Sequence, residues 1–240
     1  HAPELPVHFL IGARYLPDAC LVSHSLAWAA QRPVVPHFYD DGTLTAGDCD
    51  LLHSKLPRAR FNLIGEINQR LEAALPETDF PCLRRLRPAY PHIRKLTDIH
   101  LFPGEWKLVS DADILFFNHP TELLDHVAQH RPLHMVDIAP AYGVPHTALE
   151  RLAGCPVHPQ INVGLCHFRT ADIDWAFVEH CAASLLAEFG FTYYLEQAIA
   201  AILLARAGAI PLGKDYVVYP DVATARTANV AAMHYVDGSR

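Results

Sequence analysis

Short apolar runs alternate with longer segments of helical periodicity along most of the chain. Runs of strand length occur at 7–11, 34–39, 60–64, 107–110, 114–117, 133–138, 161–168, 209–212 and 216–219. Between them, the spacing of apolar residues predicts helices from Pro17 to about Gln31 and over 46–56, 65–75, 92–102, 120–129, 172–189 and 193–207. This alternation is typical of an α/β sandwich with a mixed, mainly parallel central sheet. Pro36 predicts a sheet edge or a bulge within the second run.

Length and composition favour one layered domain over residues 1–240. A chain of 240 residues with 51% apolar residues can bury about 70% of its extended surface, which suffices for a core without covalent staples. The six cysteines contain no Cys-X-X-Cys pair, so we expect reduced and mostly buried thiols. No internal repeat or linker-like stretch divides the chain.

The charge balance argues against a nucleic-acid partner. With 19 Lys and Arg against 26 Asp and Glu, the net charge of −7 is unsuited to a surface that follows phosphates. The longest apolar run, Ala198–Ala205, is far shorter than a membrane span, so we expect no transmembrane segment and a cytoplasmic location. Because the sequence starts at His1 rather than Met, we allow for a removed upstream segment.

Two nucleotide-binding motifs are missing from the sequence. The dinucleotide fingerprint Gly-X-Gly-X-X-Gly does not follow the first predicted strand, where Gly12, Ala13 and Arg14 stand instead. The P-loop pattern Gly-X-X-X-X-Gly-Lys-Ser/Thr does not occur either. Hydride transfer and P-loop hydrolysis are therefore disfavoured.

Asp111 and Asp113 form an acidic pair between two apolar runs. They stand at the carboxyl end of a predicted strand, where α/β sheets place their ligands. Because isolated buried carboxylates are costly, the pair calls for a cation, and hard oxygen ligands suit Mg²⁺ or Mn²⁺ bound to substrate phosphates. A plain turn, with Asp111 capping the following segment, is the alternative interpretation.

Three further positions carry polar groups in apolar surroundings. Glu196 and Gln197 open a predicted helix, where Glu196 either lies beside a reacting centre or merely favours the positive helix N-terminus. Asn162 and Gly164 interrupt an apolar strand, which indicates close approach of a ligand or backbone, or a bulge. His234 is either a nitrogen ligand completing the acidic site or an ordinary core or surface histidine.

In this order, the motifs resemble the GT-A nucleotide-sugar glycosyltransferases, most closely those of family 8. That family has an Asp-X-Asp turn, an Asn-X-Gly strand, an Asp-Gln pair opening a helix, and a late His-aromatic segment. The matching residues here are Asp111-Ala112-Asp113, Asn162-Val163-Gly164, Glu196-Gln197 and His234-Tyr235. The resemblance spans roughly residues 7–238 and implies a GT-A-like three-layer sandwich.

The resemblance also implies a function and a role for each position. It implies a hexosyltransferase that moves a sugar, with retention, from a nucleoside diphosphate sugar, with UDP-sugars favoured, to a glycan or other hydroxyl acceptor. Asp111, Asp113 and His234 would hold Mn²⁺ or Mg²⁺, and Glu196, Gln197 and Asn162 would serve the sugar and the anomeric carbon. The donor contacts expected from position are Gly12, Ala13, Tyr15, Asp41 (or its neighbour Asp40) and Lys95. Lys95 and Arg94 precede the acidic strand, where either one would offset phosphate charge, approach the acids, or lie on a solvated helix face.

Two departures from the family pattern leave other functions open. Glu196 stands where the family has Asp, and Gly238 comes one residue later than in the family pattern, so we expect an altered phosphate loop. One alternative is a catalytically silent nucleotide-sugar-binding protein of the same fold. The other is a nucleotidyltransferase, although Gly12-Ala13-Arg14 poorly replaces the basic, glycine-rich loop of those enzymes.

Overall fold

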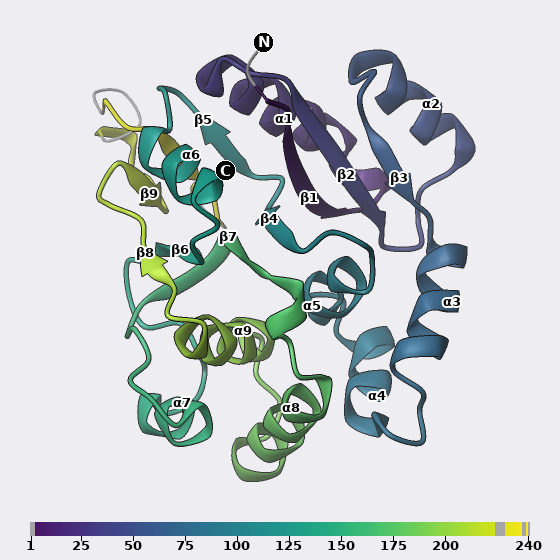
Figure 1. The fold of residues 1–240 in the computed structure, drawn as a ribbon, viewed down its shortest axis with the longest axis vertical. Coiled ribbons are helices and arrows are strands. Elements are labelled where there is room, and N and C mark those ends of the chain that lie inside the picture. Colours follow the sequence, from purple (N-terminus) through teal and green to yellow (C-terminus); the bar gives the residue numbers. More distant parts are fainter. Residues whose placement is uncertain (1–2, 224–228, 237–238, 240) are drawn as a thin grey trace.

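A computed structural model describes residues 3–223, 229–236 and 239 of the chain (Figure 1). The strands are β1 (Leu5–Ile11), β2 (Val34–Asp40), β3 (Arg60–Asn62), β4 (Trp106–Ser110), β5 (Ile114–Phe116), β6 (Leu133–Val136), β7 (Ile161–Arg169), β8 (Ile210–Pro211), β9 (Tyr216–Val218) and β10 (Ala232–His234). The helices are α1 (Leu16–Ala30), α2 (Ala46–Lys55), α3 (Ile64–Ala74), α4 (Pro81–Ala89), α5 (Ile93–His100), α6 (Thr121–Ala128), α7 (His146–Ala153), α8 (Trp175–Phe189) and α9 (Leu195–Arg206). Short 3₁₀ turns cover Ala13–Tyr15 and Thr170–Asp172.

Within the described residues, the strands form a large and a small sheet. The large sheet has the order β3-β2-β1-β4-β7-β6-β8, in which only β7 runs antiparallel to its neighbours. The small sheet has the order β5-β10-β9, with β10 antiparallel to β5 and parallel to β9. The predicted mixed, mainly parallel α/β architecture is confirmed.

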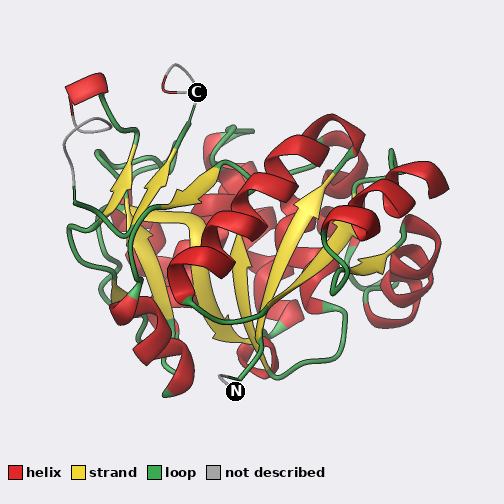
Figure 2. Ribbon diagram, turned by 90° about the horizontal axis from the view of Figure 1, so that it is seen from above, coloured by secondary structure: helices red, strands yellow, loops and turns green. Residues whose placement is uncertain are grey.

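The large sheet lies between two apolar cores, so the molecule has three layers. Figure 2 shows the strands running between helices on either side. One core packs α1, α2 and α6 against the sheet and joins it to the small sheet, and the other packs α4, α5, α7, α8 and α9 on the opposite face. β7 is buried on both faces along nearly its whole length, which explains why most of its residues are apolar.

Three elements do not appear among the predicted ones: α4, α7 and β10. α4 contains Pro88 and carries arginines between its buried apolar positions, which masks its helical period. α7 has only eight residues. β10 has three residues and is a strand because β5 and β9 flank it, a relation between segments far apart in the sequence.

Pro36 lies in an inner strand, which corrects the expected sheet edge or bulge. β2 pairs with β1 in an unbroken register, with Val7 opposite Pro36, so there is no bulge at this position. β3, on the other side of β2, begins its pairing opposite His37. Pro36 is therefore tolerated because β3 does not reach it.

The cysteines are all free, as expected, although only Cys82, Cys166 and Cys181 are fully buried. No helix in the described ranges is long and apolar enough to cross a membrane.

Candidate active site

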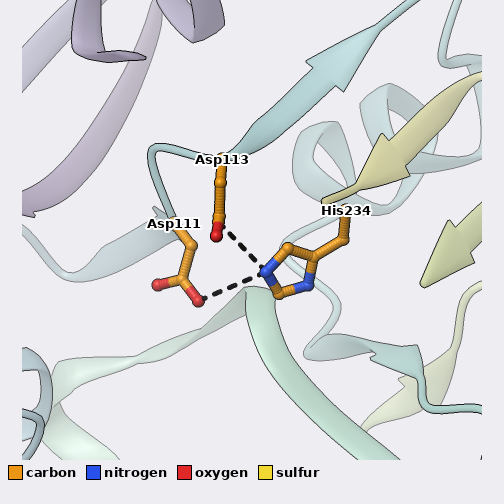
Figure 3. A group of neighbouring side chains, drawn as sticks. All are labelled: Asp111, Asp113 and His234. Carbon is orange, nitrogen blue, oxygen red and sulfur yellow. Dashed lines mark ion pairs between the residues drawn. The ribbon is translucent and has the colours of Figure 1, made fainter. Parts of the chain in front are cut away.

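The end of β4 brings Asp111 and Asp113 next to the small sheet. The chain leaves the large sheet after Ser110, turns through residues 111–113, and enters the small sheet as β5. β10 pairs with β5 so that His234 lies opposite Ile114, and the Tyr235 N–H donates to the carbonyl of Asp113 over 2.9 Å. Figure 3 shows the three side chains of the turn and β10 pointing toward one another.

Asp111, Asp113 and His234 form a compact set of possible metal ligands. His234 Nε2 lies 3.1 Å from Asp113 Oδ1 and 3.7 Å from Asp111 Oδ2. The ligand atoms of the three residues lie within 4.8 Å of one another, and His234 is buried. Two carboxylate oxygens and one imidazole nitrogen are a donor set that suits Mn²⁺ or Mg²⁺ completed by water or phosphate. The residues present fit a divalent cation.

A cavity of about 880 Å³ opens beside this set. Its wall contains most of the residues that the sequence analysis named for the site: Gly12, Tyr15, Asp41, Lys95, Asp111, Asp113, Asn162, Glu196, Gln197 and His234. Ala13 lies outside the wall, and its N–H donates to Thr43 Oγ1 over 2.8 Å. Asp40 and Arg94 do not line the cavity either. Gly238 lies outside the described residues.

Lys95 is the only lysine or arginine in the described part of the cavity wall. Its Nζ lies 2.8 Å from Asp111 Oδ1, so it approaches the acids. Burial disfavours the ammonium, but the attraction of Asp111 and Glu196 outweighs this and raises the pKa of Lys95 above its ordinary value. Arg94 instead donates to the backbone carbonyl of Asp41 and so supports the loop after β2.

Glu196 is a buried carboxyl at the start of α9. Burial raises its pKa to about 7, and nearby Asp111 adds to this shift while Lys95 opposes it. Its backbone N–H approaches the Tyr90 hydroxyl at 3.3 Å. The neighbouring Gln197 uses its amide Nε2 to donate to the Ala141 carbonyl over 2.8 Å. Such a carboxyl changes charge near neutral pH, which is a property of catalytic groups.

A bulge in β7 places Asn162 and Gly164 against His234. Opposite β6, the register shifts between His134, which pairs with Cys166, and Met135, which pairs with Asn162. A Cβ on Gly164 would lie 2.3 Å from His234 Cε1, so only glycine fits there. Asn162 Oδ1 lies 3.1 Å from His234 Nδ1. Of the alternatives that the sequence left open, the bulge is present, and the group that lies against Gly164 is the His234 side chain.

The loops after β1 and β2 close the other side of the cavity. A Cβ on Gly12 would lie 2.2 Å from Asp41 Oδ2, so glycine lets the two loops meet. Of the two acids considered there, Asp40 is buried and its carboxylate accepts from the backbone N–H groups of Gly42, Leu44 and Ile64, whereas Asp41 lines the cavity. Asp40 thus organises the loop.

Sequence reasoning missed several residues of the wall. Asp137 follows β6 and accepts a 3.0 Å hydrogen bond from Asn162 Nδ2. Its place at the carboxyl end of a strand is the signal that identified Asp111, so it was open to the same reasoning. Aromatic and imidazole rings form another part of the wall, and no spacing rule would have selected them: Tyr90, His92, Tyr193 and Tyr194.

Solved structures with the same architecture are glycosyltransferases. Mouse xyloside xylosyltransferase 1 in its apo form superposes with a TM-score of 0.63 at 11% identity, with 97% of each chain covered. The galactosyltransferase LgtC in complex with donor and acceptor sugar analogs gives 0.63 at 13% identity, over 98% of this chain and 88% of that one. This chain has the GT-A fold. The GT-A neighbours also include core-mannan synthase A from Aspergillus fumigatus in its Mn/GDP form, at a TM-score of 0.53 and 10% identity, over 85% of this chain and 70% of the other.

At the level of sequence, no protein-family model matches the chain, and no curated protein matches it. The GT-A fold expected from the resemblance is nevertheless confirmed by the structural comparison.

Proposed function

We propose that this chain is a metal-dependent glycosyltransferase. It transfers a sugar, with retention of configuration, from a nucleoside diphosphate sugar to a hydroxyl acceptor. The observation that carries the proposal is the meeting of Asp111, Asp113 and His234 at one wall of a cavity of about 880 Å³ that also exposes Glu196 and Lys95. The GT-A fold supports it, as does the complex of one neighbour with donor and acceptor sugar analogs.

Asp111, Asp113 and His234 would hold the divalent cation, either Mn²⁺ or Mg²⁺. A cation bound there supplies Lewis-acid stabilisation of the diphosphate oxygens as the anomeric bond breaks. The Mn/GDP form of core-mannan synthase A is consistent with this chemistry. Asp111 also pairs with Lys95: its Oδ1 accepts a hydrogen bond from the Lys95 ammonium, while its Oδ2 lies toward His234.

Glu196 and Gln197 would face the reacting sugar. When ionised, the buried carboxylate of Glu196 stabilises positive charge that develops on the anomeric carbon. Lys95 sits close enough to favour that ionised form. Gln197, held by the Ala141 carbonyl through Nε2, keeps its Oε1 available for a sugar hydroxyl.

The loops that meet at Gly12 and Asp41 would receive the nucleoside. Asp41 offers carboxylate oxygens to ribose or base donors, and Tyr15 in the same wall offers a ring for stacking. We favour a UDP-sugar as donor and a glycan or another hydroxyl compound as acceptor. Ala13, whose N–H is used by Thr43, supports this loop from outside the wall.

Release of free nucleoside diphosphate tests the proposal directly. UDP-, GDP- and ADP-sugars are incubated with the protein and Mn²⁺, with and without a chelator. We expect metal-dependent release from one donor class. Donor binding without any release or transfer would indicate the catalytically silent binding protein, and release of pyrophosphate from a nucleoside triphosphate would indicate a nucleotidyltransferase.

Asp113→Ala should abolish Mn²⁺-dependent donor binding because it removes one of the three ligand groups, while the fold remains intact. Calorimetry with and without chelator measures the binding, and circular dichroism checks the fold. Asp50→Ala, at an exposed position of α2, is the matched control and should bind like the parent. Undiminished donor binding by the Asp113 variant would remove the metal role.

A further inference from the structure

The amide of Asn162 has only one orientation compatible with its surroundings. Its Oδ1 accepts the backbone N–H of Gly164 over 2.9 Å, and a backbone N–H can only donate. Its Nδ2 therefore points to the other side, where it donates to Asp137 Oδ2 over 3.0 Å. Asn162 is buried, with an exposed fraction of only 5%.

This orientation decides which nitrogen of His234 carries the proton. Asn162 Oδ1 lies 3.1 Å from His234 Nδ1, and because that oxygen only accepts, Nδ1 must be the donor. In the neutral ring, Nε2 is then left with its lone pair. Nε2 is also the atom that faces Asp113 at 3.1 Å and Asp111 at 3.7 Å.

We propose that Asn162 is a positioning residue that fixes His234 in the Nδ1–H tautomer, so that Nε2 is presented as a metal ligand between Asp111 and Asp113. This inference rests on the metal site of the proposed function. It assigns to Asn162 a task different from the contact with the donor sugar that the family resemblance implies. Metal-bound histidines commonly donate their second ring nitrogen to such a partner, which fixes both tautomer and ring orientation.

The backbone around His234 leaves the ring little other freedom. Its carbonyl accepts the Tyr219 N–H over 2.9 Å, and the residue pairs with Ile114 and Val218 in the small sheet. The ring lies against Gly164, where any Cβ would collide with it. The protonation pattern of the two nitrogens is thus the property that remains to be set, and Asn162 sets it.

Nitrogen NMR of the histidine rings tests the tautomer without any turnover. Two-bond proton–nitrogen correlations of the ¹⁵N-labelled protein distinguish Nδ1–H from Nε2–H, and the His234→Gln spectrum identifies the signals of His234. We expect a proton on Nδ1 both without metal and with diamagnetic Mg²⁺. A neutral ring protonated at Nε2 alone would overturn the inference, whether or not the protein turns out to be a transferase.

Metal affinity tests the consequence. Asn162→Leu removes the acceptor and should weaken Mn²⁺ binding about 10- to 100-fold, as loss of such a supporting partner typically does. Gln197→Leu removes an amide of the same cavity that bonds to Ala141 rather than to His234, and should leave Mn²⁺ affinity unchanged. Titration calorimetry or electron paramagnetic resonance of Mn²⁺, with no donor present, gives the affinities.

An exchange of groups provides a rescue. Combining Asn162→Asp with Asp137→Asn keeps an acceptor for both Gly164 and His234 and restores the link between positions 137 and 162. We expect the double variant to recover most of the Mn²⁺ affinity and the Nδ1–H signal that Asn162→Leu loses. Equal Mn²⁺ affinity in Asn162→Leu and the parent would overturn the positioning role while leaving the proposed transferase intact; absence of Mn²⁺ binding by the parent would instead refute the metal site itself.

Discussion

Glu196 is a residue for which the sequence left two environments open. The sequence offered a helix N-terminus or a reacting centre, and the structure places the carboxyl in the cavity wall, buried beside Lys95. The strand-end position indicated a ligand site at Asp111 and Asp113, and the family resemblance implied that His234 joins them. The structure brings the three side chains together. The sequence left open whether Lys95 meets phosphate, the acids or solvent, because the packing around a long side chain decides its direction. In the structure it contacts Asp111.

The raised pKa of Glu196 predicts a pH dependence of activity. Because burial raises this pKa to about 7, the free protein gains the ionised carboxylate as pH rises through that value, and donor turnover should rise with it. Glu196→Gln should lower turnover far more than donor affinity and should remove this limb of the profile. Equal losses in turnover and affinity would indicate a structural glutamate.

The raised pKa of Glu196 also makes the stability of the protein depend on pH. Glu196 has a pKa of 4.5 in the unfolded chain and about 7 in the folded protein, so between these values the folded state holds more protons. The free energy of unfolding therefore falls as pH rises through this range, by up to about 3 kcal/mol. Relative to the parent, Glu196→Gln should therefore gain stability between about pH 5 and about pH 8. Urea unfolding of both proteins at the two pH values measures this difference. A constant difference would argue against a buried, titrating carboxyl.

At the scale of elements, α5 and β4 are joined by a buried lysine. Lys107 of β4 donates through Nζ to the carbonyl of Ile99 in the last turn of α5 and to that of Phe102 just after it, each over 2.6 Å. α5 carries Lys95 and β4 leads to Asp111, so Lys107 links the elements that present the two partners of the ion pair. Nothing in the sequence distinguished Lys107 from an exposed lysine.

Lys107→Met should destabilise the protein by about 2–4 kcal/mol, because two buried carbonyls lose their partner. The loss should also loosen α5 and weaken the contact between Lys95 and Asp111. Lys55→Met, at an exposed position of α2, is the matched control and should change stability by less than about 0.5 kcal/mol. Denaturant unfolding compares the two, and similar effects in both variants would contradict the linking role.

Element boundaries were predictable where a long apolar period decided them. The helix predicted over 193–207 is α9, and the strand predicted over 161–168 is β7. α4 was not predictable because Pro88 and its arginines outweigh the local pattern, although Cys82, Leu83 and Leu86 are buried. β10 and the bulge of β7 depend on partners elsewhere in the chain, so the setting of His234 by Asn162 could not be read from local sequence.

At the scale of the whole molecule, the sheet buries several histidines in their neutral form. Burial lowers the pKa of His8 to about 2 and those of His134 and His167 to about 4, and it lowers that of His100 well below its ordinary value. In the unfolded chain these rings take up protons near pH 6.5, whereas the folded protein does not. The unfolded state then holds more protons, so stability is complete above about pH 6.5 and is lost as pH falls toward about 4.

We expect the free energy of unfolding to drop by about 2 kcal/mol for each such histidine between about pH 6.5 and about pH 5. Glu196 acts in the opposite direction, but it is one group against four. His167→Gln should flatten the dependence, whereas His53→Gln, at an exposed position of α2, should leave it unchanged. Chemical denaturation across this range measures the slope, and a flat profile in the parent would contradict the prediction.

The three proposed ligand groups come from two places about half the chain apart: the turn between β4 and β5, and β10 near the end of the described residues. A nascent polypeptide that has already emerged through α9 possesses both aspartates yet lacks the imidazole. If these groups hold the proposed cation, the full ligand set exists only after β10 has been made and has paired with β5 in the small sheet.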